Sequence, residues 1–287
     1  MWNPFSKTGE KECRARFEKV KSNEEAINNI FAIQYGMDDV ETEVDGAKIS
    51  IRLADTEREM RSLLSYGVGC MFGRYSLDEG GLILADQGST IVDYLAKIPA
   101  PTFMPDDDNI LPILDEEWFE DDIVAGFKSW LRAAYGDETL DVNVAFIEQG
   151  LGKDLRTYFV KDFYKDHVKV YQKRPIYWLI QSPKKSFQAL VYMHRMDKDT
   201  ITKVLTDYVQ PFRRKLDAQV QVLRATGVNR DAAKADKYQA VIQEMIDWER
   251  DVLYPMSQQH IEIDLDDGVK KNYPKFKGAV AKVQGLL

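Results

Sequence analysis

Residues 171–195, YQKRPIYWLIQSPKKSFQALVYMHR, form the stretch that decides the fold. Two runs rich in β-branched and aromatic residues, 176–180 and 187–193, flank the Pro- and Ser-containing segment 181–186. Such residues favour strands, and turn-forming residues between two strand-like runs are typical of a β-hairpin. The sequence therefore predicts a hairpin with its tip at 181–186.

Basic side chains gather at both ends of this predicted hairpin. Lys184 and Lys185 occupy the tip. The open end carries Lys173, Arg174, His194 and Arg195. A buried sheet with a cationic rim suits a nucleic-acid-binding protein. The alternative is a core hairpin whose flanking charges simply face water.

The charges are segregated along the chain, although the net charge is −8. Residues 76–150 carry 3 basic and 17 acidic side chains (3 − 17 = −14), whereas residues 151–230 carry 17 basic and 7 acidic ones (17 − 7 = +10). Because a local patch of one sign attracts nucleic acid whatever the total charge, the basic segment is the candidate binding region. The predicted hairpin lies within it.

The composition, 44% hydrophobic and 30% charged, is that of a folded globular protein. No apolar run approaches the roughly 20 residues that span a bilayer. We therefore expect a cytoplasmic protein with no membrane partner. Two cysteines, Cys13 and Cys70, are too few for a disulfide framework or a cysteine metal cluster.

Residues 1–98 are expected to form a mainly helical N-terminal region. An apolar stripe through 11–35 predicts helix, and Ser22 followed by Glu25 predicts a capping box that divides it in two. Further elements are expected as a short strand over 47–53 and a helix over 57–72.

Residues 99–117 are expected to be an acidic, proline-rich connector. Four prolines and three consecutive aspartates, 106–108, indicate an exposed loop here. The remainder, 118–287, is expected to be a target-recognition region of helices and the β-hairpin. Its first helices are expected over 118–134, 138–149 and 153–166.

Residues 199–254 show the clearest helical pattern in the chain. Two stretches with apolar residues at three- and four-residue steps are joined by a turn at 227–229, which predicts a long antiparallel helical hairpin acting as a spacer. Pro211 is expected to kink its first helix unless it lies at a break, and Pro255 is expected to stop its second. The tail, 260–276, predicts a strand, an Asp-Gly turn and a closing segment. The fold class is thus predominantly α-helical α+β, with a small β-hairpin or sheet.

Motifs of several enzyme classes are absent from the sequence. There is no GxxxxGK[ST] loop and no GxSxG elbow, and the three histidines lack metal-site spacing. Gly67 and Gly69 lie in a helical pattern without the dinucleotide-binding spacing, which favours close packing. The acidic run 106–122 has no lysine at the short spacing of a metal-dependent nuclease. A solvated acidic face is the preferred interpretation, with protein docking as the alternative.

Several long motifs resemble the BREX phage-defence adenine methyltransferases of the PglX family, in the region that follows their catalytic domain. The likeness runs in order from about residue 25 to the end. Its motifs are RYSLDEGGLILADQG (74–88), WFEDDIV (118–124), LGKDLRTYFVKDFYKDH (151–167), KRPIYWLIQSPKKSFQALVYMHR (173–195) and HIEIDLDDGVKKNYPKF (260–276).

The resemblance implies a DNA N6-adenine methyltransferase that uses S-adenosylmethionine. Catalysis in such enzymes needs a glycine-rich cofactor loop and an Asn/Asp-Pro-Pro-aromatic motif that holds a flipped adenine. This sequence has neither, since Asn3-Pro4-Phe5 lacks the second proline and no cofactor loop precedes it. We expect a non-catalytic C-terminal recognition module that binds no cofactor itself and has no activity alone. S-adenosylmethionine is expected for the full-length enzyme.

The expected partners are double-stranded DNA, a methyltransferase domain or subunit, and other BREX proteins. Candidate phosphate-contacting side chains are Lys169, Lys173, Arg174, Lys184, Lys185, Arg213, Arg214 and Lys215. Candidate base-reading side chains are Gln181, Gln188 and Arg195. Two alternatives remain: a module that docks defence-complex proteins without touching DNA, or a truncated relic of the enzyme.

Overall fold

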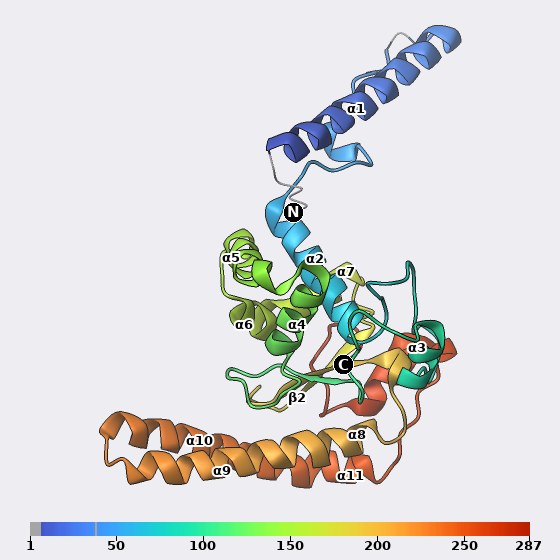
Figure 1. Cartoon of the computed structure of the whole chain (residues 1–287). Helices are drawn as coiled ribbons and strands as arrows, with labels where there is room; N and C mark the ends of the chain where they lie inside the picture. The colour runs from blue at the N-terminus through green and yellow to red at the C-terminus, as the bar shows by residue number, and fades with distance from the viewer. Residues whose placement is uncertain (1–6, 38) are drawn as a thin grey trace. The chain divides into compact units, whose positions relative to one another are not determined.

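The computed structural model describes residues 7–37 and 39–287. These described residues form two compact units that divide between Met60 and Arg61 (Figure 1). The main element of the first unit is the helix α1 (Lys7–Tyr35), which continues through the predicted break at Ser22. The capping box is wrong because the Glu25 carboxylate instead accepts from Val44 N at 3.1 Å.

The short strand predicted over 47–53 is also wrong. A 3₁₀ turn, Gly46–Lys48, occupies its start because the Asp45 side chain accepts from Ala47 N and caps the turn. No strand is assigned between residues 39 and 60.

A three-stranded antiparallel sheet forms the centre of the second unit. The strands are β1 (Ile110–Pro112), β2 (Tyr177–Gln181) and β3 (Gln188–Tyr192), in the order β1-β3-β2. β2 and β3 pair from Tyr177 opposite Tyr192 to Gln181 opposite Gln188, which confirms the predicted hairpin. Ser182 N donates to Phe187 O across the tip.

The two faces of the hairpin pack against different helices, as the two-residue period of a strand requires. Trp178, Ile180, Ala189 and Val191 belong to a core that includes Phe212 and other residues of the C-terminal helices. On the opposite face the Tyr177 ring stacks on His167 and Phe72, with centroids 4.6 and 5.0 Å apart. The sheet is therefore enclosed between two helical layers.

β1 lies inside the segment that was expected to be an exposed connector. Ile110, Leu111, Ile113 and Leu114 are all 3% exposed or less. The exposed-loop prediction is therefore wrong for this part of the segment, because β1 supplies the third strand against β3. The sequence-based division into 1–98, 99–117 and 118–287 stays a prediction.

Six α-helices lie in the sequence between residue 56 and the start of the β2–β3 hairpin. They are α2 (Thr56–Met71), α3 (Ile91–Lys97), α4 (Ile123–Tyr135), α5 (Leu140–Leu151), α6 (Leu155–Tyr158) and α7 (Tyr164–Val170). α4 begins five residues after the predicted start because buried Asp122 caps it, accepting from Val124 N and Ala125 N. The same carboxylate forms a two-fold ion pair with Arg156 at 2.8 and 2.9 Å.

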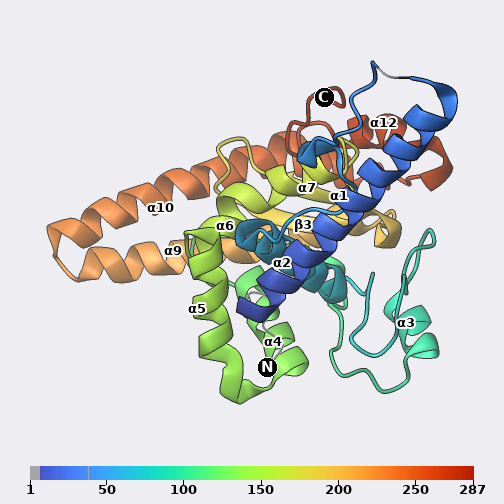
Figure 2. The same cartoon turned by 90° about the horizontal axis from the view of Figure 1, so that it is seen from above.

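The predicted helical hairpin is confirmed by α9 (Gln210–Ala225) and α10 (Asn229–Trp248), which project as an arm from the second unit (Figures 1 and 2). Short helices flank the pair: α8 (Thr200–Lys203), α11 (Tyr254–Ser257) and α12 (Gly268–Asn272). π-helical turns, Val204–Val209 and Glu249–Leu253, precede Pro211 and Pro255 respectively. The helix therefore continues past Pro255 instead of ending there.

The C-terminal segment runs beside β2. Ala281 N donates to Leu179 O and Gln181 N donates to Ala279 O, so the outer edge of the sheet is paired. The strand predicted at the start of 260–276 is wrong, since the ordered elements there are helical turns, with Asp264 capping the first. The predominantly helical α+β class is confirmed. Within the described residues, no helix is both long and apolar enough to cross a bilayer.

Candidate nucleic-acid interface

A groove of about 1200 Å³ lies where the sheet ends at the hairpin tip. Three parts of the second unit border it: the helical segment 159–165, the hairpin residues 181–188 that include the tip, and the C-terminal segment 277–287. Its floor is apolar, with Ile113 and Leu179 among the residues that line it. We call this feature the basic groove, for the reasons that follow.

Two glutamines lie side by side at the end of the sheet. Gln181 and Gln188 are opposite each other in the β2–β3 register and both line the basic groove. In the backbone, Gln181 N donates to Ala279 O, and Gln188 O accepts from Ile113 N. Neither side-chain amide has a hydrogen-bond partner among the residues that the structure describes. Both amides therefore retain their donors and acceptors for a ligand.

Five lysines line the basic groove: Lys161, Lys165, Lys185, Lys277 and Lys282. Asp162 also lines it, but its carboxylate already binds Lys153 at 2.7 Å and Lys165 at 3.4 Å. For the other four ammonium groups, the described part of the chain supplies no carboxylate partner. The groove thus combines unneutralised positive charge with an apolar floor and two free amides.

The hairpin tip is fixed to α10 by a buried carboxylate. Glu244 is 7% exposed, and its oxygens accept from Lys184 N at 2.6 Å and from Ser186 Oγ at 2.5 Å. Lys185 adopts a left-handed backbone conformation with φ of 65°, which the bonds on either side maintain. The hairpin tip is therefore anchored to α10 by hydrogen bonds and is not a loose loop.

Three of the predicted site residues, Gln181, Lys185 and Gln188, line the basic groove. Lys184 is exposed on the tip, and the remaining hairpin candidates Lys169, Lys173 and Arg174 are exposed at its open end.

Arg195 does not fit its predicted base-reading role. It is 7% exposed, and its guanidinium donates to the carbonyl oxygens of Phe72, Asp106 and Asp107 at 3.3, 2.8 and 2.8 Å. These bonds join the end of the hairpin to the chain that precedes β1. Arg195 is a structural residue in this fold.

The basic cluster on α9 is partly used within the protein. Arg213 forms an ion pair with Glu249 at 2.9 Å. The Lys215 ammonium group donates to Trp118 O and lies 4.2 Å from the centre of the Phe119 ring. Arg214 is exposed. None of the three lines the basic groove.

Sequence reasoning missed four of the groove lysines: Lys161, Lys165, Lys277 and Lys282. The first two lie in a segment that showed only a helical pattern. The last two lie in 275–282, KFKGAVAK, where three lysines flank small apolar residues. That pattern was a usable signal, but its place beside β2 depends on long-range pairing that the local sequence does not specify.

Some carboxylates of the acidic run 106–122 lie close together and are partly buried, instead of facing solvent. Oxygens of Asp106, Asp108 and Asp121 lie within 4.8 Å of one another, and the single hydroxyl of Tyr208 lies within hydrogen-bond distance of the last two. Burial and the neighbouring Asp108 raise the pKa of Asp106 to about 8. By their number and spacing these carboxylates could hold a cation, but the backbone amides of Asn109 and Ile110 and the Tyr208 hydroxyl already bind their oxygens. We assign no metal here.

No protein-family model matches the chain. It is 34% identical over 286 residues to the adenine-specific methyltransferase PglX of Lacticaseibacillus casei (strain Zhang), which covers 93% of this chain and 23% of that protein. It is 35% identical over 282 residues to the adenine-specific methyltransferase BrxX of Escherichia coli O9:H4 (strain HS), covering 91% and 23%. The chain thus spans about a quarter of these relatives. The resemblance is confirmed: the chain is homologous to one portion of the PglX/BrxX methyltransferases.

Proposed function

We propose that this chain is a non-catalytic DNA target-recognition module of an adenine-specific DNA methyltransferase, and that it holds DNA along the basic groove. One observation supports the assignment most strongly. Four lysines without a carboxylate partner in the described chain line the same groove as two unpaired glutamine amides. DNA offers the matching chemistry, since its phosphates are anionic and its base edges carry hydrogen-bond donors and acceptors.

The lysines and the glutamines have different tasks in this proposal. Lysine–phosphate contacts fix the register of the duplex and supply most of the affinity, without reading sequence. A glutamine amide matches the N6 and N7 groups of adenine in the major groove, so Gln181, at the rim, is the stronger base-reading candidate. Gln188 is 5% exposed, so only a group that enters the groove deeply can reach its amide.

Methyl transfer itself is assigned to a part of the enzyme that this sequence does not contain. The relatives are methyltransferases, and this chain matches 23% of each. It carries neither a glycine-rich cofactor loop nor an Asn-Pro-Pro-aromatic motif. We therefore place S-adenosylmethionine on a partner methyltransferase domain or subunit within a BREX system.

The assignment is tested by neutralising two groove lysines. Lys185→Gln with Lys277→Gln removes two positive charges from the groove while nearly retaining side-chain length. We expect the slope of log affinity against log salt to become shallower by about 0.9 for each phosphate that is no longer neutralised. Fluorescence anisotropy of a labelled duplex at several salt concentrations measures it.

A matched control changes the same net charge elsewhere. Lys198→Gln with Lys270→Gln alters two exposed lysines that do not line the groove. This variant should retain the wild-type slope and affinity. Equal reductions of affinity in both double variants would show general charge attraction and remove the groove from the interface.

A second candidate function, protein docking, is favoured by the first unit. Apolar side chains of α1 are exposed, with Ile30 at 64% and Ile33 at 82%. Exposed apolar stripes of this kind mark interaction surfaces. Wild-type protein that fails to bind DNA at low salt would make docking the leading function.

A further inference from the structure

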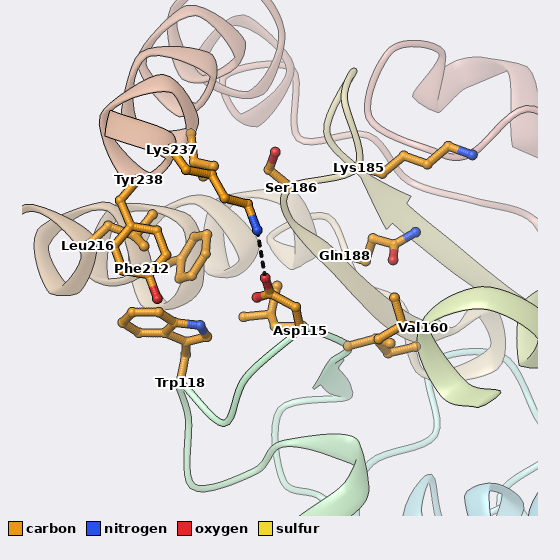
Figure 3. Close-up of a pocket in the computed structure, with 13 residues that line it drawn as sticks. Asp115, Trp118, Val160, Lys185, Ser186, Gln188, Phe212, Leu216, Lys237 and Tyr238 are labelled. Carbon is orange, nitrogen blue, oxygen red and sulfur yellow. Dashed lines mark ion pairs between the residues drawn. The ribbon is translucent and has the colours of Figure 1, made fainter. Parts of the chain in front are cut away.

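A second, smaller cavity adjoins the basic groove. Its volume is about 210 Å³, and helices α9 and α10, the tip and the segment 113–118 enclose it (Figure 3). Ile113, Val160, Lys185 and Gln188 line both the cavity and the groove. A strand bound in the groove would therefore pass the mouth of this cavity.

The walls of the cavity are mainly aromatic. Trp118, Phe212 and Tyr238 line it, with the Trp118 ring edge-on to the other two at centroid distances of 5.4 and 5.8 Å. Leu216 and Val241 complete the apolar surface. Such a lining suits a flat, weakly polar ring.

One wall carries a hydrogen-bond donor that is not used. Trp118 Nε1 is buried and has no partner among the described residues. In Figure 3 the indole nitrogen faces the interior of the cavity. An unpaired buried donor is unfavourable. Because neighbouring atoms cover this nitrogen, a small turn of the indole ring would let a ligand acceptor restore the missing bond. Asp115 and Lys237, 3.8 Å apart, give the cavity a polar edge.

We propose that this cavity takes one unstacked nucleobase from the DNA held in the basic groove. An apolar cavity of about 150 Å³ is large enough for benzene, so 210 Å³ accommodates a single planar heterocycle. A nucleobase supplies aromatic faces for the walls and a carbonyl or ring-nitrogen acceptor for Trp118 Nε1. The groove lysines hold the flanking phosphates. The inference rests on the proposed function.

The base held here is distinct from a methyl acceptor. The chain has no Asn-Pro-Pro-aromatic motif to orient an exocyclic amine. The cavity therefore acts in recognition, by stabilising a local distortion of the duplex. Sequences whose bases unstack easily would then be bound more tightly, without any contact to a paired base edge.

The test compares a matched duplex with the same duplex carrying one unpaired, bulged base. Unstacking costs least for a base that has no partner, so the wild-type chain should bind the bulged duplex roughly tenfold or more tightly. Val241→Phe fills the cavity while leaving every groove lysine in place. It should bind both duplexes with the affinity of wild type for the matched one.

Two further variants complete the design. Ala240→Phe places the same ring on the exposed neighbour in α10 and should retain the preference for the bulge. Trp118→Phe keeps an aromatic wall, removes the N–H donor and should reduce the preference several-fold. Thermal unfolding of each variant establishes that it is folded.

The outcomes separate this proposal from the proposed function. Equal binding of both duplexes by wild type, or a preference that persists in Val241→Phe, would overturn the cavity assignment alone. Failure of wild type to bind either duplex at low salt would overturn the groove and the cavity together.

Discussion

His167 shows how a single polar side chain is built into the core of the second unit. The residue is 4% exposed, and its Nε2 accepts from the backbone amides of Ile176 and Tyr177 at 3.2 and 3.0 Å. Burial, together with the positive charge of Arg74, lowers the pKa of the imidazole from its ordinary 6.5 to about 3. Protonation at Nε2 would break both bonds, which sit at the start of β2.

A pH dependence of stability follows from this lowered pKa. The neutral ring is required in the folded state, whereas an unfolded chain protonates His167 as pH falls below about 6.5. The stabilisation is therefore complete above pH 6.5 and is lost as the pH falls toward 3, by up to about 1.4 kcal/mol per unit. His167→Gln retains an acceptor and removes this titration.

The measurement is urea unfolding of both proteins between pH 7 and pH 4. The stability advantage of wild type over His167→Gln should shrink steadily with acidification. All other titrating groups, including His194, whose pKa burial lowers to about 4, are common to both proteins. Parallel curves would contradict the role assigned to His167.

Residue types alone predicted some of the candidate site but not the state of each side chain. Gln181 and Gln188 were identified from their places beside the tip, and both line the groove. Arg195 carried the same local signal, yet the carbonyl groups that surround it come from Phe72 and 106–107. Burial of a charged side chain depends on such distant partners, which its neighbours in sequence do not reveal.

Among the elements, α2 packs closely because two of its residues have no side chain. A Cβ at Gly67 would lie 2.6 Å from Phe127 Cε2 and 3.0 Å from Trp130 Cε3. A Cβ at Gly69 would collide with the Tyr75 ring. The packing interpretation of these glycines is confirmed, and the close approach of α2 to α4 depends on it.

Gly67→Ala should destabilise the protein. Overpacking of a filled core costs about 1–3 kcal/mol, offset by about 1 kcal/mol of improved helix propensity. We expect a net loss of up to about 2 kcal/mol in the free energy of unfolding, measured with urea. Gly80→Ala is the control, since nothing lies within 4 Å of its Cβ position. Equal stability of the two variants would refute the packing role.

Local sequence predicted elements best where one periodic pattern persisted. The β2–β3 hairpin and the α9–α10 pair follow from their two-residue and helical periods. β1 was missed because Ile110–Pro112 is three residues long and lies among prolines and aspartates, where only pairing with β3 makes it a strand. Pro211 lies at a break, where a π-helical turn meets the start of α9. Pro255 does not stop the helix, because a second π-helical turn runs on into α11.

For the whole molecule, the division of charge along the chain becomes a division in space only after folding. The predicted basic region, 151–230, supplies Lys161, Lys165 and Lys185 to the groove. The opposite side of the groove is formed by residues 277–287, which lie outside the basic region identified from the charge count. Sequence therefore indicated the family and the sign of the surface. The groove itself arises from pairing of the C-terminal segment with β2, which joins distant parts of the chain.

Salt-dependent DNA binding by the wild-type chain tests the central claim most directly. Anisotropy of a labelled mixed-sequence duplex would be measured between roughly 50 and 200 mM salt. Four lysine–phosphate pairs predict a slope of log affinity against log salt of about −3.6, a decrease on the order of 100-fold across that range. A slope near zero, or no binding at the lowest salt, would contradict the assignment of the basic groove as a DNA surface.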